Sequence, residues 1–203
     1  MSPAAPSANA AGALLRVRMA LHSGDVAGAR AQAEAARRAF PGDAPLADAA
    51  GDLAMKSGDP LGAATHFAAA CAIAPQVAEY AVNHAIALQQ SERHGEAIAV
   101  LARHDESGRK DARYASVRAL SERALGRPEA AARWYDIALG LEPARPRALH
   151  GRARIALERG EADALARFDR ALAVTPGDAD LWLGKAQALE VAGDAAGARA
   201  IAE

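Results

Sequence analysis

The sequence has a single cysteine and few aromatic residues. Cys71 is the one cysteine among 203 residues, so an intrachain disulfide and a cysteine-based metal cluster are excluded, and a reducing compartment is favoured. Aromatic residues make up 4% of the chain, although 51% of it is hydrophobic. Much of the apolar content is alanine, which suits closely packed helices better than one large globular core.

Charge of one sign and long apolar runs are also lacking. The chain has 24 basic and 25 acidic residues, whereas a general nucleic-acid binder carries a strong basic excess. No run of 18 apolar residues occurs, so no membrane span is expected. The N-terminal residues, MSPAAPSANAAGALL, lack the basic region and long apolar stretch of a signal peptide. We therefore expect no nucleic-acid or membrane partner, a cytoplasmic location, and a disordered tail at residues 1–9.

Motifs that would carry catalysis or bind metal are missing. There is no His-Glu-x-x-His helix, no glycine-rich phosphate loop and no Gly-x-Ser-x-Gly elbow. His94 and His104 lie ten residues apart, close to one helical face, without a third ligand in register. Cys71 lies in an alanine-rich helical stretch that is typical of a buried, inert thiol. The sequence therefore predicts no enzyme, no metal and no cofactor.

Two kinds of marker residue recur with one period. Glycines and prolines are spaced by 33 or 34 residues, or by 68 where one marker is missing. They are Gly24, Gly58, Gly126, Gly160 and Gly193, and Pro41, Pro75, Pro143 and Pro176. The missing glycine falls at Glu92, within a turn-like segment, SERHGEA. An internal period of this length indicates a repeat architecture.

Each repeat is predicted to be a helix, a tight turn and a second helix. The stretch 44–75 is the most regular copy, with Gly58 at its turn and Ala63, Phe67 and Ala70 on one face of its second helix. We expect the alanines to let the two helices approach closely and the aromatic ring to fill the gap to the next hairpin. The repeats span residues 10–43, 44–77, 78–111, 112–145, 146–178 and 179–203, of which the last is incomplete.

This pattern resembles the tetratricopeptide repeat (TPR) family over residues 10–203. The family pattern has Trp, Leu-Gly and Tyr in the first helix and Ala, Phe, Ala and Pro in the second. Trp182 occupies the tryptophan position of the last repeat, and Gly51 the small-residue position of the second. The resemblance implies an all-α fold, a right-handed superhelical solenoid of antiparallel helix hairpins in a bacterial-type array of about six repeats.

The resemblance also implies a groove lined by the first helices, which binds a protein or peptide. The positions that face a partner in the family map onto Arg18, His22, Asp48, Asp52, Lys56, Asn83, Ile86, Gln90, Arg113, Leu120, Arg123, Arg147, His150 and Arg154. Asn83 stands where family members use asparagine to hold a partner's backbone. Asp48 and Asp52 stand where co-chaperone members clamp a terminal carboxylate, and their charge disfavours a chaperone-tail ligand.

Arginines gather at the groove positions of the fourth and fifth repeats. Arg113, Arg123, Arg147 and Arg154 stand there against Glu158, and arginine forks suit carboxylates. Our hypothesis is that an acidic segment of an extended partner binds at these repeats. The alternative is that these arginines form a solvated, ion-paired face.

Two departures from the family pattern leave alternatives open. The leucine position of the first helix holds Arg16, His84, Arg118, Arg152 and Lys185 in most repeats. This basic row is either structural, with long stems packing and charged ends reaching nearby acids, or a line of charge offered to an anionic ligand. The third repeat ends in a polar segment, RHDESGRKDAR, without proline, so we expect its second helix to end early and the segment to be a hinge or a contact loop.

Three functions are compatible with the sequence. The first is a non-enzymatic scaffold that binds a protein or peptide. The second is an N-terminal, substrate-recruiting module of a larger enzyme, such as a sulfotransferase or glycosyltransferase, because the sequence stops at Glu203 inside the expected second helix of the sixth repeat and no polar capping helix follows. The third is self-association through this uncapped C-terminal end.

Overall fold

The computed structural model describes residues 9–202. Apart from Asn9, the tail predicted at residues 1–9 lies outside these residues, as does Glu203. The chain divides into two compact units, unit 1 (residues 1–104) and unit 2 (residues 105–203). The boundary falls in the polar segment at the end of the third predicted repeat.

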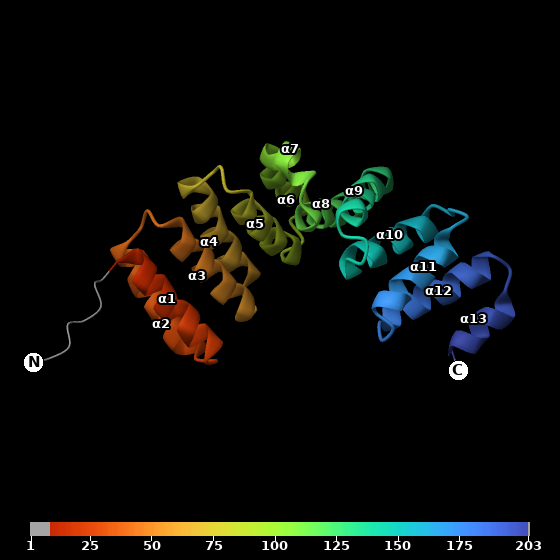
Figure 1. The fold of residues 1–203 in the computed structure, drawn as a ribbon, viewed down its shortest axis with the longest axis horizontal. Coiled ribbons are helices and arrows are strands. Elements are labelled where there is room, and N and C mark those ends of the chain that lie inside the picture. Colours follow the sequence, from red (N-terminus) through yellow and green to blue (C-terminus); the bar gives the residue numbers. More distant parts are fainter. Residues whose placement is uncertain (1–8, 203) are drawn as a thin grey trace, which may run out of the picture. The chain divides into compact units, whose positions relative to one another are not determined.

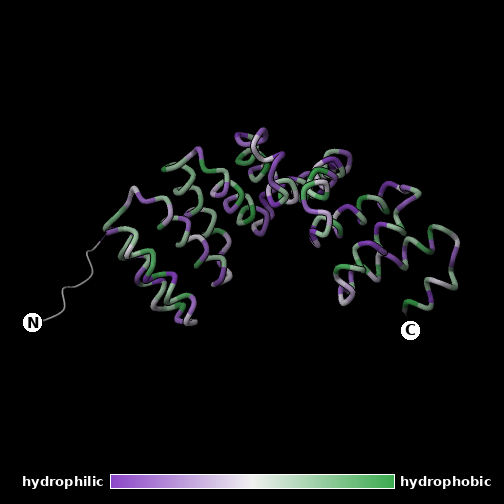
Figure 2. The backbone as a smooth tube through the Cα atoms, viewed as in Figure 1, coloured by the Kyte–Doolittle hydropathy of each residue, from purple (hydrophilic) through white to green (hydrophobic). Residues whose placement is uncertain are grey.

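Both units consist of helices joined by short turns (Figure 1). In unit 1 the helices are α1 (Ala10–His22), α2 (Val26–Ala39), α3 (Ala44–Lys56), α4 (Pro60–Ile73), α5 (Ala78–Gln90), α6 (His94–Leu101) and the short 3-10 helix η1 (Ala102–His104). In unit 2 they are α7 (Asp105–Gly108), α8 (Ala112–Ala124), α9 (Pro128–Leu141), α10 (Pro146–Glu158), α11 (Ala164–Val174), α12 (Ala179–Val191) and α13 (Ala195–Ala202). Within each unit consecutive helices pack as antiparallel hairpins, and hydrophobic and hydrophilic residues alternate along them (Figure 2). The all-helical, TPR-like fold class is therefore confirmed, while the repeat boundaries remain our proposal.

Aspartates begin several second helices in the same way. The side chains of Asp25, Asp59 and Asp194 each accept a hydrogen bond from the backbone N–H of a glycine three residues later, at 2.8 Å. Such a cap satisfies one of the N–H groups that the first turn of a helix leaves unpaired. Each of these glycines leaves space for the aspartate carboxylate, which a Cβ would meet. The first turn of α2, α4 and α13 is thus specified locally.

Aromatic rings fill the spaces that glycines leave. Phe67 packs on Gly51, where an added Cβ would lie 2.5 Å from the ring. Tyr135 and Phe168 pack in the same manner on glycines of the following first helix. All three rings are at most 2% exposed. The tight contact of helices predicted from the alanine and aromatic pattern is present, and Phe67 makes it within its own hairpin, on Gly51 of α3.

The turns within the hairpins use a left-handed residue at one position. The five marker glycines at these turns have φ between +63° and +85°, and Glu92 holds the same place with φ +58°. This conformation costs an L-residue about 1–2 kcal/mol, which glycine avoids. Glu92 therefore carries local strain in the turn between α5 and α6.

Replacing Glu92 with glycine is expected to raise the free energy of unfolding by about 0.5–1 kcal/mol. The gain is smaller than the full strain because glycine loses more backbone entropy on folding. The contact of Glu92 with His94 is no obstacle, since that carboxylate is 89% exposed and such pairs contribute little. Urea unfolding followed by circular dichroism measures the change. Glu92→Ala keeps the positive φ and is expected to give no gain, so equal stabilisation by both variants would contradict the strain.

None of the helices formed by residues 9–202 combines the length and apolar character that crossing a bilayer requires.

Candidate peptide-binding groove

The first helices of unit 1 place the predicted groove residues on neighbouring surfaces. Helix α3 contacts both α1 and α5. Most of the predicted residues here are exposed, namely Arg18, His22, Asp52, Lys56 and Gln90, while Ile86 is half-buried. Asn83 is buried, and its Nδ2 donates a hydrogen bond to Asp48 Oδ1 at 2.8 Å. The side chain predicted to hold a partner's backbone is thus bonded within the protein, between α5 and α3.

The first helices of unit 2 hold the predicted arginines in different surroundings. Arg123 pairs with Glu158, its Nε lying 3.1 Å from Oε1, and this hydrogen bond raises the pKa of Arg123. Arg113 is half-buried and also has a partner. Arg147 is exposed and Arg154 half-buried, and neither pairs with a carboxylate among residues 9–202. The cluster is therefore divided, with two arginines on α10 open to an external anion.

Two other predicted residues of this unit lie close to the arginines. His150 on α10 contacts Asp178 at 3.3 Å between Nδ1 and Oδ2. Leu120 on α8 is half-buried. Beside them the Tyr135 ring is buried, which raises the pKa of its hydroxyl to about 12 and keeps it neutral.

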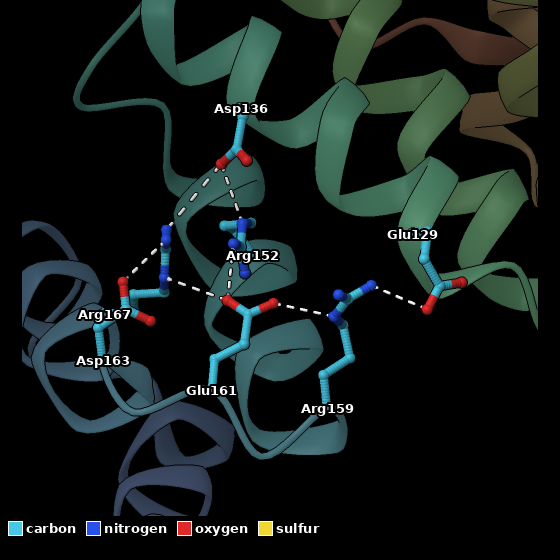
Figure 3. Close-up of polar contacts among 7 residues, drawn as sticks. All are labelled: Glu129, Asp136, Arg152, Arg159, Glu161, Asp163 and Arg167. Atoms are coloured by element: carbon cyan, nitrogen blue, oxygen red, sulfur yellow. Dashed lines mark hydrogen bonds and ion pairs between the residues drawn. The ribbon is translucent and has the colours of Figure 1, made fainter.

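The basic row is ion-paired in unit 2. Arg152 lies between two carboxylates, with Nε 2.9 Å from Asp136 Oδ1 and Nη2 2.7 Å from Glu161 Oε2. Figure 3 shows that these residues continue into a network with the residues Arg167, Asp163, Arg159 and Glu129. Lys185 repeats the arrangement one hairpin later, with Nζ 2.7 Å from Asp169 Oδ1. These side chains bind acids of α9, of α11 and of the turn between α10 and α11, so this part of the row is structural.

Arg118 is the third paired member of the row. Its Nη1 lies 2.8 Å from Asp105 Oδ1 and its Nε 3.0 Å from Glu122 Oε1. Its guanidinium also lies 5.5 Å from the centre of the Trp134 ring, a cation–π distance. Tyr114 donates a hydrogen bond to Asp105, and burial raises the pKa of this tyrosine. The short helix α7 is therefore held against α8 by polar contacts where a longer second helix is absent.

The row is different in unit 1. Arg16 is exposed, and the position is Ala50 in the second repeat. His84 is half-buried, and burial lowers its pKa. It lines a cavity of about 360 Å³ together with Cys71, whose pKa burial raises to about 11. A thiol with this pKa is almost wholly protonated at neutral pH, so it is a poor nucleophile.

No cluster of three or more histidine, cysteine or acidic side chains suited to a metal ion occurs within residues 9–202. The predictions that the protein lacks a metal, a cofactor and enzymatic activity remain predictions.

The acidic partners of the basic row were missed from sequence. Asp136 and Asp169 lie one repeat apart and precede Arg152 and Lys185 by the same number of residues. An acidic residue at a constant distance before the basic residue in two repeats is the sequence signal that predicts these ion pairs.

Comparison with known proteins places the chain in a family. The sequence matches the tetratricopeptide repeat over residues 54–120, and again over residues 117–164 and 162–203. The chain belongs to the tetratricopeptide repeat family, as its repeat pattern predicted. No curated protein sequence matches it at a significant level.

Solved bacterial structures share the fold at low sequence identity. PilF of Pseudomonas aeruginosa is 18% identical, with a TM-score of 0.80 over 95% of this chain and 88% of that one. PilW, described as a widely conserved type IV pilus biogenesis factor, is 19% identical, with a TM-score of 0.83 over 97% of this chain and 91% of that one. YrrB, described as a TPR protein with an unusual peptide-binding site, is 16% identical, with a TM-score of 0.70 over 85% of this chain and 89% of that one. At these identities the likeness shows the fold alone.

Proposed function

We propose that the protein is a non-enzymatic scaffold that holds an extended partner peptide along its first helices, with an acidic segment against α8 and α10. Tetratricopeptide repeats generally serve as protein-interaction scaffolds, and a solved structure of this fold is described as having a peptide-binding site. We keep the cytoplasmic location as part of the proposal, because a single cysteine suits a reducing compartment.

The observation that carries the acidic partner is the pair Arg147 and Arg154 on α10. Several other basic side chains of unit 2, such as Arg118 and Arg152, are neutralised by carboxylates of the chain. Arg147 and Arg154 pair with no carboxylate among the described residues. Guanidinium groups bind carboxylates through two parallel hydrogen bonds, so α10 offers two such positions to a partner.

The proposal predicts selective binding of acidic peptides. Fluorescence polarisation with acidic, neutral and basic peptides of equal length is expected to show tightest binding of the acidic one. The double variant Arg147→Ala/Arg154→Ala is expected to weaken that binding about tenfold, because each exposed charge pair contributes at most about 1 kcal/mol. The affinity of the unmodified protein is expected to fall with added salt, which screens exposed charges.

Arg133→Ala is the matched control. Arg133 is exposed on α9, a second helix, so its loss removes one positive charge, half the change in the double variant, without touching the first-helix face. Equal binding of the acidic and neutral peptides would contradict the proposal. So would equal affinities of the double variant and the unmodified protein.

A further inference from the structure

A cavity of about 470 Å³ lies in unit 1 on a different surface, between α2, α3 and α4. Helix α2 contributes most of its charged lining, α3 contributes its apolar floor, and α4 contributes His66. The charged and titratable residues that line it are Arg30, Glu34, Arg37, Arg38, Asp59 and His66. None of them belongs to the predicted groove, so this cavity is independent of the function proposed above.

The cavity exists because one repeat lacks a long side chain. Ala50 on the cavity floor occupies the position of the basic row. At the equivalent positions of unit 2, Arg152 and Lys185 fill the space between neighbouring helices and pair with acids. Alanine leaves that space empty.

The charge of the cavity is unbalanced. Arg30, Arg37 and Arg38 all line it, and none of them forms an ion pair with any residue from 9 to 202. Arg37 is half-buried, and its guanidinium donates to His66 Nδ1. A ring nitrogen that accepts this hydrogen bond is unprotonated, so His66 is neutral in this arrangement. Burial, and next the charge of Arg37, lower the pKa of His66. The half-buried guanidinium therefore has an uncharged partner, whereas Arg118 and Arg152 in unit 2 have carboxylates as partners.

Two acids oppose these three arginines. Asp59 Oδ1 already accepts the Gly62 N–H at 2.8 Å as the cap of α4. Glu34 lies on α2, one turn from both Arg30 and Arg38, and pairs with neither. Three guanidinium groups thus face two carboxylates, one of which is partly satisfied, so the cavity favours an anion.

We propose that this cavity binds a phosphoryl group, with Arg37 as its central donor and Arg30 and Arg38 flanking it. A phosphoryl group offers three acceptor oxygens and about two negative charges, which match three guanidinium forks better than a single carboxylate does. The volume exceeds that of inorganic phosphate, so the natural ligand carries more atoms, either as a phosphorylated small molecule or as a phosphorylated side chain.

Titration of the full chain with inorganic phosphate tests the assignment, at constant ionic strength maintained with chloride. NMR is expected to show a saturable shift of the His66 imidazole and a rise in the pKa of His66, because phosphate offsets the charge of Arg37. Arg37→Gln is expected to weaken binding about tenfold or more, and Arg133→Gln on α9 is expected to leave it unchanged. Glu34→Gln is expected to tighten binding, because it removes an opposing charge.

A second variant distinguishes loss of the phosphate site from loss of folding. Ala50→Leu places the family's leucine at this position, fills the cavity floor without adding charge, and is expected to keep the fold while abolishing the phosphate response. No saturable shift with the unmodified protein would overturn the proposal. Weaker phosphate binding by Glu34→Gln would also overturn it, because that carboxylate would then support the bound anion instead of opposing it.

Competition then separates the two sources of the phosphoryl group. A phosphoserine peptide and glycerol 3-phosphate are each added to the phosphate-bound protein. Displacement by either one supports the assignment and identifies the class of ligand. Displacement by neither overturns it.

Discussion

Replacing Tyr135 with alanine is expected to lower the free energy of unfolding by about 3–5 kcal/mol, the usual cost of removing a buried aromatic ring. Tyr135 is 1% exposed and packs directly on Gly151 of the next hairpin. Helix α9 and helix α10 are in contact here, and alanine would leave a void that neither backbone can fill without moving. Urea unfolding followed by circular dichroism measures the loss.

Leu141→Ala provides the control on the same helix. Leu141 is 45% exposed, so its truncation is expected to change stability by no more than about 0.5 kcal/mol. Comparable losses from both variants would contradict the view that this ring joins two hairpins. Because a repeat array depends on contacts between neighbouring repeats, the Tyr135→Ala transition is also expected to be broader than that of the unmodified protein.

The repeat architecture could be predicted because its signals are local and recur. A turn that needs positive φ favours glycine in each repeat. The period of the repeat was still recognisable at the one such turn where Glu92 takes that conformation instead. The small residues and rings on one helical face similarly predicted close packing, which Gly51 and Phe67 show. These features depend on a few neighbouring residues, so one sequence suffices to find them.

The polar contacts could not be predicted in the same way. Asn83 was expected to face a partner, yet it bonds Asp48 on the neighbouring first helix. Arg123 was grouped with the arginines offered to an acidic partner, with an ion-paired face as the alternative, and Glu158 binds it. Each contact joins residues about one repeat apart, and its geometry depends on the rotation between hairpins, which spacing alone does not specify. The cavity beside Ala50 was missed for a related reason, since it arises from a side chain that is small in one repeat and long in others.

Arg152→Ala is expected to lower the free energy of unfolding by about 2 kcal/mol. The Arg152 side chain is 7% exposed and holds Asp136 and Glu161 together. Removing one member of a buried pair leaves uncompensated charge and costs about 3–5 kcal/mol, but Asp136 is 53% exposed and water offsets part of this loss. Thermal and urea unfolding of the variant measure the change.

Lys185→Ala is the matched comparison for this prediction. Lys185 occupies the same repeat position but is 24% exposed and pairs with one carboxylate, Asp169, so its loss is expected to cost less than about 1 kcal/mol. Combining Arg152→Ala with Glu161→Gln is expected to cost less than the sum of the two single changes, because the second removes a charge that the first left unpaired. Equal costs for the arginine and lysine variants, together with simple additivity, would contradict a structural role for the basic row. Arg152 and Lys185 would then be candidates for binding a ligand in unit 2, and the proposed role of Arg147 and Arg154 would lose its support.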